Sequence, residues 1–199
     1  MSGDEIKADL EEFFALVITC LNEAKIKYVV VGAIASIVWG RPRTTMDVEV
    51  VIDATKVEIQ SFARILEVNG FIYGTKDILV AIKENSIATI LHEDFPYKID
   101  IQGVYEPLNE RTLSNRIFLK VFGQEAYVEK PEDLIIAKLR YDRSTDFDDA
   151  KAILIRQNTK LNYKYLERIA RQENLLDDLK TLFDSVAKYK QQNKVQKTD

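Results

Sequence analysis

The sequence predicts an α/β or α+β core of mixed strands and helices, followed by a bundle of helices. Short apolar runs suited to strands alternate with amphipathic helical patterns as far as residue 130. From Pro131 onward the hydrophobic spacing is helical only. At 199 residues, 46 % of them hydrophobic, the chain suits one domain with a small helical appendage. We therefore expect a core over residues 1–130, a helical bundle over 131–189 and a disordered polar tail over 190–199.

The core is expected to alternate helices with short strands. Gly32 and Gly40 bound one short buried helix, and Asn69-Gly70 is a typical C-terminal cap for another. Residues 71–90 are ambiguous, because a short strand there is followed by either a loop or a helix before the next strand. The expected elements are helices over 4–24, 33–39 and 56–68, strands over 27–31, 46–52, 86–91 and 97–102, and a hairpin over 117–128.

The helical bundle is expected to begin at Pro131, which is also the best candidate for a domain boundary. Proline suits the first position of a helix, and Glu132 and Asp133 suit its first turn, where the backbone dipole favours negative charge. Four helices are expected in this part of the chain, over 131–141, 146–157, 162–171 and 174–189.

Charge and cysteine content narrow the class of protein. The 28 basic and 32 acidic side chains are too evenly balanced for a globally basic nucleic-acid binder. One cysteine, Cys20, excludes an internal disulfide and fits a reducing cytosol, and its helical neighbours mark it as a small buried hydrophobe. The longest nearly apolar run, 28–39, is too short to span a bilayer, and the acidic first residues do not suit a signal peptide. We expect a cytoplasmic protein.

Three carboxylates on two expected strands carry the clearest chemical signal. Asp47 and Glu49 are separated by one apolar residue, so both side chains point to the same face of a strand. Asp100 lies between Ile99 and Ile101 in a second strand-like run. Carboxylates held together repel one another unless a cation neutralises them, and a divalent metal is the usual cation. The sequence therefore predicts a metal site made by Asp47, Glu49 and Asp100.

The residues before Asp47 suit phosphate. Gly32 lies between a buried strand and the helix over 33–39, whose first amides suit a phosphate, although a tight strand–helix turn explains the same glycine. Two arginines and two threonines precede Asp47, with Arg43 and Thr45 nearest to it. They suit a triphosphate or an RNA backbone, or else a solvated loop with salt bridges. A phosphate-friendly turn, a basic loop, paired acids and a distant third acid together describe a two-metal phosphoryl-transfer site.

The layout G-x(n)-G-x-x-R-x-T-x-D-h-[DE]-h from Gly32 to Val50 resembles the nucleotidyltransferase superfamily related to DNA polymerase β. This resemblance implies a small mixed β-sheet flanked by helices. It further implies that Asp47 and Glu49 bind Mg²⁺ or Mn²⁺, and that Asp100 completes the site and helps to activate the incoming hydroxyl.

Residues 130–149 resemble, more narrowly, the branch that contains the nucleotidyltransferase toxins of abortive-infection systems. The match lies in the motifs P-x-D-L-h-h-h-K-L and R-x-x-D-x-x-D. The resemblance implies that Lys138 contacts NTP phosphates and that Asp146 and Asp149 line or brace the pocket. On the residues alone, Lys138 would equally extend outward from an apolar helix, and the aspartates would be N-terminal charges on the next helix. The implied nucleotide-binding residues are Gly32, Ala33, Ser36, Arg43, Thr45, Lys138, Asp146 and Asp149.

The predicted function is transfer of NMP from an NTP to a hydroxyl of RNA, tRNA included, or of a protein, in a toxin-like role with an antitoxin-like partner. Two positions depart from the family pattern. Ala33 stands where a glycine or serine usually holds the terminal phosphates, and the second acid, Glu49, is commonly aspartate. A second hypothesis is therefore a non-catalytic nucleotide- or partner-binding protein on the same fold. A metal nuclease is disfavoured, because residues 99–104 lack the lysine of the common restriction-type core.

Overall fold

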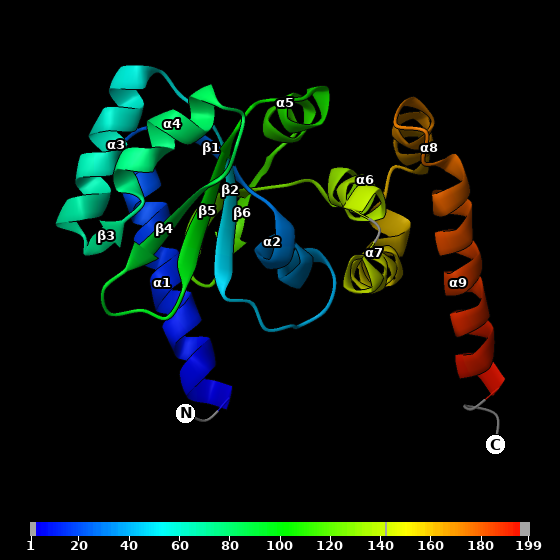
Figure 1. Cartoon of the computed structure of the whole chain (residues 1–199). Helices are drawn as coiled ribbons and strands as arrows, with labels where there is room; N and C mark the ends of the chain where they lie inside the picture. The colour runs from blue at the N-terminus through cyan, green and yellow to red at the C-terminus, as the bar shows by residue number, and fades with distance from the viewer. Residues whose placement is uncertain (1–2, 142, 196–199) are drawn as a thin grey trace. The chain divides into compact units, whose positions relative to one another are not determined.

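The computed structural model describes residues 3–141 and 143–195, and the chain divides into two units (Figure 1). The first comprises Met1–Ile34 and Thr44–Glu129, and the second comprises Ala35–Arg43 and Lys130–Asp199. Residues 35–43 thus group with the bundle, whereas the sequence places them in the core. Side chains far along the chain hold this segment: Arg156 Nη1 donates to the Gly40 carbonyl at 3.0 Å and Gln157 Nε2 to the Trp39 carbonyl at 2.8 Å.

Among the described residues of the first unit, seven strands form one mixed sheet in the order β3-β4-β5-β2-β1-β7-β6. β2 runs parallel to β5 and β1 parallel to β7, and the other neighbours are antiparallel. The strands are β1 (Lys27–Val30), β2 (Asp47–Asp53), β3 (Phe71–Tyr73), β4 (Ala88–His92), β5 (Lys98–Gly103), β6 (Ile117–Val121) and β7 (Gln124–Val128). The predicted mixed α/β fold is confirmed.

The alternation predicted for β2 and β5 is present in the structure. Val48 and Val50 on β2, and Ile99 and Ile101 on β5, are fully buried, while the acids between them are partly exposed. Both strands have a hydrogen-bonded neighbour on each side, since β5 lies between β4 and β2, and β2 between β5 and β1. These central strands are therefore a rigid platform for the side chains on their polar face.

The helices of the first unit are α1 (Gly3–Glu23), α3 (Lys56–Val68), α4 (Ile78–Lys83) and α5 (Pro107–Ser114), with a 3-10 turn over Thr75–Asp77. α3 has its predicted bounds because Thr55 and Glu58 form a capping box at its start. In the stretch 71–90, for which a loop or a helix was expected after the first strand, the structure has the short helix α4. α5 was not predicted, because its eight residues are mostly polar and carry no clear apolar stripe; Pro107 at its first turn is the signal it does carry.

Cys20 on α1 is fully buried, as predicted, and burial raises the pKa of its thiol to about 11. A neutral, enclosed thiol is a packing residue and not a nucleophile.

The second unit contains α6 (Pro131–Tyr141), α7 (Ser144–Gln157), α8 (Tyr163–Gln172) and α9 (Leu176–Val195), with a 3-10 turn over Asn158–Lys160; α2 (Gly32–Trp39) begins in the first unit and continues in the second. Glu132 Oε1 accepts the backbone N–H of Asn162 at 2.7 Å and so ties α6 to the start of α8. α9 extends to Val195, so the expected disordered tail is wrong for residues 190–195; residues 196–199 lie outside the described part. In the described ranges no helix combines the length and apolarity that crossing a membrane requires.

Candidate active site

The parallel pairing of β2 with β5 brings the predicted acids together. In this register Glu49 lies opposite Asp100, and Asp47 lies opposite Lys98. Directly opposed residues point to the same face of a sheet, and so do residues two apart on one strand. Asp47, Glu49 and Asp100 therefore share one face, with Lys98 among them. We call these three acids the strand carboxylates.

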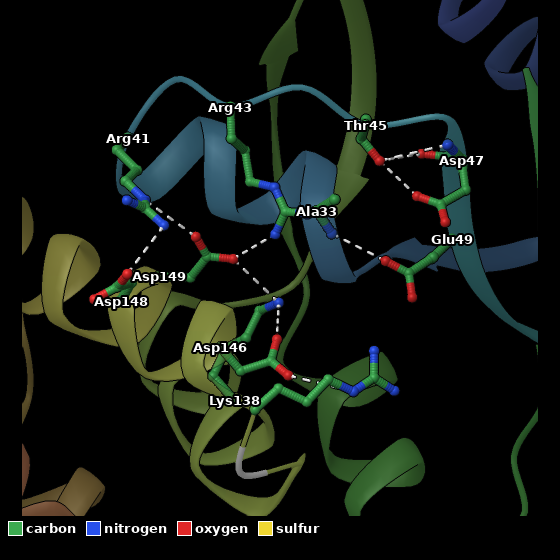
Figure 2. Close-up of polar contacts among 11 residues, drawn as sticks. Ala33, Arg41, Arg43, Thr45, Asp47, Glu49, Lys138, Asp146, Asp148 and Asp149 are labelled. Carbon is green, nitrogen blue, oxygen red and sulfur yellow. Dashed lines mark hydrogen bonds and ion pairs between the residues drawn. The ribbon is translucent and has the colours of Figure 1, made fainter.

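Asp47 is oriented by the threonine two positions before it. Thr45 Oγ1 donates to Asp47 Oδ1 at 2.5 Å (Figure 2). Thr45 is 8 % exposed, so this hydroxyl is held by its surroundings. Thr45 was predicted to bind nucleotide; in this structure its hydroxyl fixes the carboxylate of Asp47.

Glu49 turns toward the start of α2. Its Oε2 accepts the backbone N–H of Ala33 at 3.0 Å (Figure 2). Gly32 adopts φ +64°, and a Cβ built there would lie 1.7 Å from Glu49 Oε2. The glycine is thus needed both for its left-handed backbone and for the space that the carboxylate fills. The helix start predicted to hold phosphate holds a carboxylate of the protein itself, as the backbone dipole favours.

Both oxygens of Asp100 have partners on the same face. Thr89 Oγ1, from β4, donates to Oδ1 at 2.7 Å. Lys98 Nζ donates to Oδ2 at 2.5 Å and lies 3.9 Å from Asp47 Oδ2. Sequence reasoning missed Thr89 and Lys98. For Lys98 a signal existed, because Lys-Ile-Asp is the same one-residue alternation that paired Asp47 with Glu49.

Lys98 is charged in this environment. Desolvation acts to lower its pKa, but the hydrogen bond and charge of Asp100, helped by Asp47 and Glu49, outweigh it, so the pKa of Lys98 lies above its ordinary value. With Glu49 turned to Ala33 and Lys98 paired to Asp100, no group of three or more His, Cys, Asp or Glu side chains in the described residues is arranged to hold a metal ion. The metal assignment of the strand carboxylates stays a prediction.

A second set of predicted site residues is connected by ion pairs within the second unit. Asp149 is fully buried and pairs with Arg43 Nη1 at 2.6 Å, Arg41 Nε at 3.3 Å and Lys138 Nζ at 3.4 Å (Figure 2). Lys138 also donates to Asp146 Oδ1 at 2.7 Å. We call these five residues the buried ion-pair cluster.

The buried ion-pair cluster bears on the alternatives left open for its members, although their nucleotide contacts stay a prediction. Lys138 is 7 % exposed, so the expectation that it extends into solvent is wrong. Asp146 lies in the first turn of α7, as the alternative reading has it, and both Asp146 and Asp149 are buried partners of cations. Asp148, by contrast, is exposed and lies 3.8 Å from Arg41 Nη2.

The structure thus groups the predicted residues by unit. Ala33, Thr45 and the strand carboxylates are joined by direct contacts in the first unit. Arg43, Lys138, Asp146 and Asp149 are joined in the second. Ser36, on α2, is buried. Its nucleotide contact stays a prediction, as does that of each residue named here.

Comparison with solved structures finds proteins that share this fold. The antibiotic-resistance factor ANT(2'')-Ia superposes with a TM-score of 0.53 at 10 % identity, covering 92 % of this chain and 97 % of that one. An antigenic nucleotidyltransferase-like protein from Paracoccidioides brasiliensis gives 0.52 at 16 % identity, covering 92 % and 94 %. At these identities the likeness establishes the fold. No family model and no curated protein matches the sequence.

Proposed function

We propose that this protein is a metal-dependent nucleotidyltransferase that transfers NMP from an NTP to a hydroxyl acceptor. The observation that carries the proposal is the β2–β5 register, which sets Asp47, Glu49 and Asp100 on one face of a nucleotidyltransferase-like sheet. Rigid neighbouring strands hold such a set of acids in place without ordering a loop, which favours a catalytic role.

The strand carboxylates fit a magnesium or manganese ion in their chemistry. They are hard oxygen donors, and two of them sit opposite each other in register. Asp47, Glu49 and Asp100 would hold the ion, which when bound supplies positive charge to the triphosphate oxygens. Binding of the ion at Glu49 Oε2 would compete with the bond from the N–H of Ala33, and binding at Asp100 Oδ2 would compete with the bond from Lys98.

The chain's own groups then have distinct roles. Asp100, held at Oδ1 by Thr89, would help to activate the attacking hydroxyl, whose oxygen bonds to the α-phosphorus as pyrophosphate leaves. Asp47 is kept in one orientation by Thr45. The N–H of Ala33, once Glu49 leaves it, is a donor for a phosphate oxygen at a helix start.

The proposed acceptor is a hydroxyl of RNA, such as a tRNA 3′ end, or of a protein. The toxin-like motifs of residues 130–149 support this choice and a protein partner of antitoxin type. In those motifs Lys138 is the residue assigned to NTP phosphates, but its buried ammonium is paired with Asp146 and Asp149, which supports a structural role better.

The test is label transfer from each labelled NTP, with Mg²⁺, to total tRNA or to a protein extract. Asp47→Asn and Asp100→Asn should each lower transfer by about 100-fold or more, as loss of a catalytic group does. Asp53→Asn is the matched control, because Asp53 ends the same strand, is exposed and pairs with Lys27. Transfer that survives both catalytic variants, or no transfer to any acceptor, would overturn the proposal.

A second candidate function is non-catalytic nucleotide or partner binding on the same fold. Two contacts favour it: Lys98 already neutralises Asp100, and Glu49 already satisfies the N–H of Ala33. Thermal-shift titration with NTP, with and without Mg²⁺, separates the two candidates. Binding without turnover supports this second role, whereas turnover that Asp100→Asn abolishes excludes it.

A further inference from the structure

Lys98 supplies the strand carboxylates with a positive charge of the protein's own. Its Nζ bonds Asp100 Oδ2 at 2.5 Å and lies 3.9 Å from Asp47 Oδ2. The register fixes this placement, since Lys98 lies opposite Asp47 and two residues before Asp100 on β5. The ammonium therefore faces both aspartates.

A divalent metal ion bound by Asp47 and Asp100 would be a second cation beside the ammonium of Lys98. The two positive charges repel strongly at such short range, in surroundings less polar than water. Pairing of the Lys98 ammonium with the aspartates therefore weakens the binding of the metal ion, and the reverse also holds. We propose, resting on the function proposed above, that Lys98 is a positioning residue that competes with the divalent cation for Asp47 and Asp100, so that cation binding releases Lys98 from Asp100.

The exposure of the groups allows this exchange. The side chains of Lys98 and Asp100 are 35 % and 17 % exposed, so both groups have water within reach when they separate. Lys138 differs, because its side chain is 8 % exposed and its partners Asp146 and Asp149 are 8 % and 0 % exposed. The ion pair between Lys98 and Asp100 can therefore separate, whereas the ion pairs of Lys138 remain formed.

Thr89 keeps Asp100 in place during the exchange. Its hydroxyl holds Oδ1, the oxygen that Lys98 does not use. The carboxylate therefore presents Oδ2 in the same position whichever cation occupies it. Competition from Lys98 makes the nucleotide-free protein bind the metal ion more weakly than the same three carboxylates would without Lys98.

The first experiment is a Mn²⁺ titration followed by electron paramagnetic resonance, without nucleotide, on the full chain. Lys98→Met should bind Mn²⁺ about tenfold more tightly than the wild type, because a competing charge is gone. Lys27→Met is the matched control: Lys27 is also a strand lysine paired with an aspartate, Asp53, at 2.8 Å, and its loss should leave Mn²⁺ affinity unchanged. A merely structural lysine would give the opposite sign, with weaker Mn²⁺ binding in Lys98→Met.

The second experiment uses the wild-type protein and so holds even if Lys98→Met fails to fold. Amine-reactive labelling, read by mass spectrometry, should rise at Lys98 as Mn²⁺ saturates, with Lys27 as the unchanged internal reference. Labelling of Lys98 that stays constant at saturating Mn²⁺ would overturn the inference.

The outcomes also separate this inference from the proposed function. Equal Mn²⁺ affinity in the wild type and Lys98→Met leaves the nucleotidyltransferase proposal standing and removes the role of Lys98. Absence of Mn²⁺ binding in both proteins removes the metal assignment, and the inference with it.

Discussion

The strand carboxylates and the buried ion-pair cluster both set aspartates against a lysine, yet they differ in burial. The side chains of Lys138 and Asp149 are 8 % and 0 % exposed, whereas those of Lys98, Asp47 and Asp100 are 35 %, 30 % and 17 % exposed. A charge removed from water must keep its partner, while a partly exposed charge can replace a partner by water. We infer that the buried ion-pair cluster serves stability and that the strand carboxylates can exchange partners, as a ligand site must.

The way each aspartate is satisfied supports the same distinction. Asp149 gathers three cations, Arg41, Arg43 and Lys138, around one fully buried carboxylate. Asp100 has one cation and one hydroxyl, from Lys98 and Thr89. Removal of Asp149 takes from the buried Lys138 one of its two carboxylates, whereas separation of Lys98 from Asp100 leaves two partly exposed groups that water can reach. The predictions below test this contrast, beginning with the largest expected effect.

Asp149→Ala should cost about 3–5 kcal/mol of unfolding free energy, because it removes the fully buried carboxylate shared by Arg41, Arg43 and Lys138 and leaves the buried Lys138 with Asp146 alone. Urea unfolding followed by circular dichroism measures the loss. Asp148→Ala is the control on the next position of α7: Asp148 is exposed and its pair with Arg41 is long, at 3.8 Å. It should change stability by no more than about 0.5 kcal/mol. Equal costs for the two variants would contradict a structural role for the buried carboxylate of Asp149.

Gly32→Ala should cost less, at about 2–3 kcal/mol. Left-handed backbone is strained by about 1–2 kcal/mol in an L-residue, and the new Cβ would also displace the Glu49 carboxylate from the N–H of Ala33. Gly123→Ala isolates the strain, since Gly123 has φ +83° and nothing lies within 4 Å of an added Cβ. Thermal and urea unfolding of both variants measure the difference.

A double variant sharpens this result. In a Glu49→Ala background the added Cβ at Gly32 meets no carboxylate, so its cost should fall to that of Gly123→Ala. If the cost of Gly32→Ala is unchanged in that background, the contact between Glu49 and the start of α2 contributes nothing.

The sequence predicted the parts of this contrast that depend on local spacing. Asp47 and Glu49 share a face because they lie two apart on one strand, and that much is readable from alternation alone. Their meeting with Asp100 depends on the parallel register of β2 and β5, which no local pattern specifies. It was expected because Asp100 has the same apolar neighbours on a second strand, and the resemblance to nucleotidyltransferases implied the same grouping. Lys98 was not predicted, although the same alternation places it beside Asp100, because a metal ion was expected to neutralise the three acids.

The buried ion-pair cluster was less predictable. Arg43 and Asp149 are 106 positions apart, so their contact depends on how the helices of the second unit pack. A lysine on an apolar helix usually extends into solvent, and the sequence pattern gives no sign of the two aspartate partners that keep Lys138 buried. α5 was missed for a related reason: a short helix with mixed polar residues is stabilised by tertiary packing more than by its own pattern.

Thr89→Val should have the smallest effect, a loss of about 0.5–1.5 kcal/mol, because one exposed hydroxyl bond to Asp100 is removed and water can replace it. Urea unfolding measures the change, and Thr19→Val, whose exposed hydroxyl donates to the Ala15 carbonyl on α1, controls for the substitution itself. The near-isosteric valine keeps the β-branched shape that suits strand β4, so the lost bond is the main difference. A loss as large as that of Asp149→Ala would mean that Asp100 depends on its partners as a buried charge does. The strand carboxylates would then be a second structural cluster, and exchange of Lys98 for a metal would be too costly to occur.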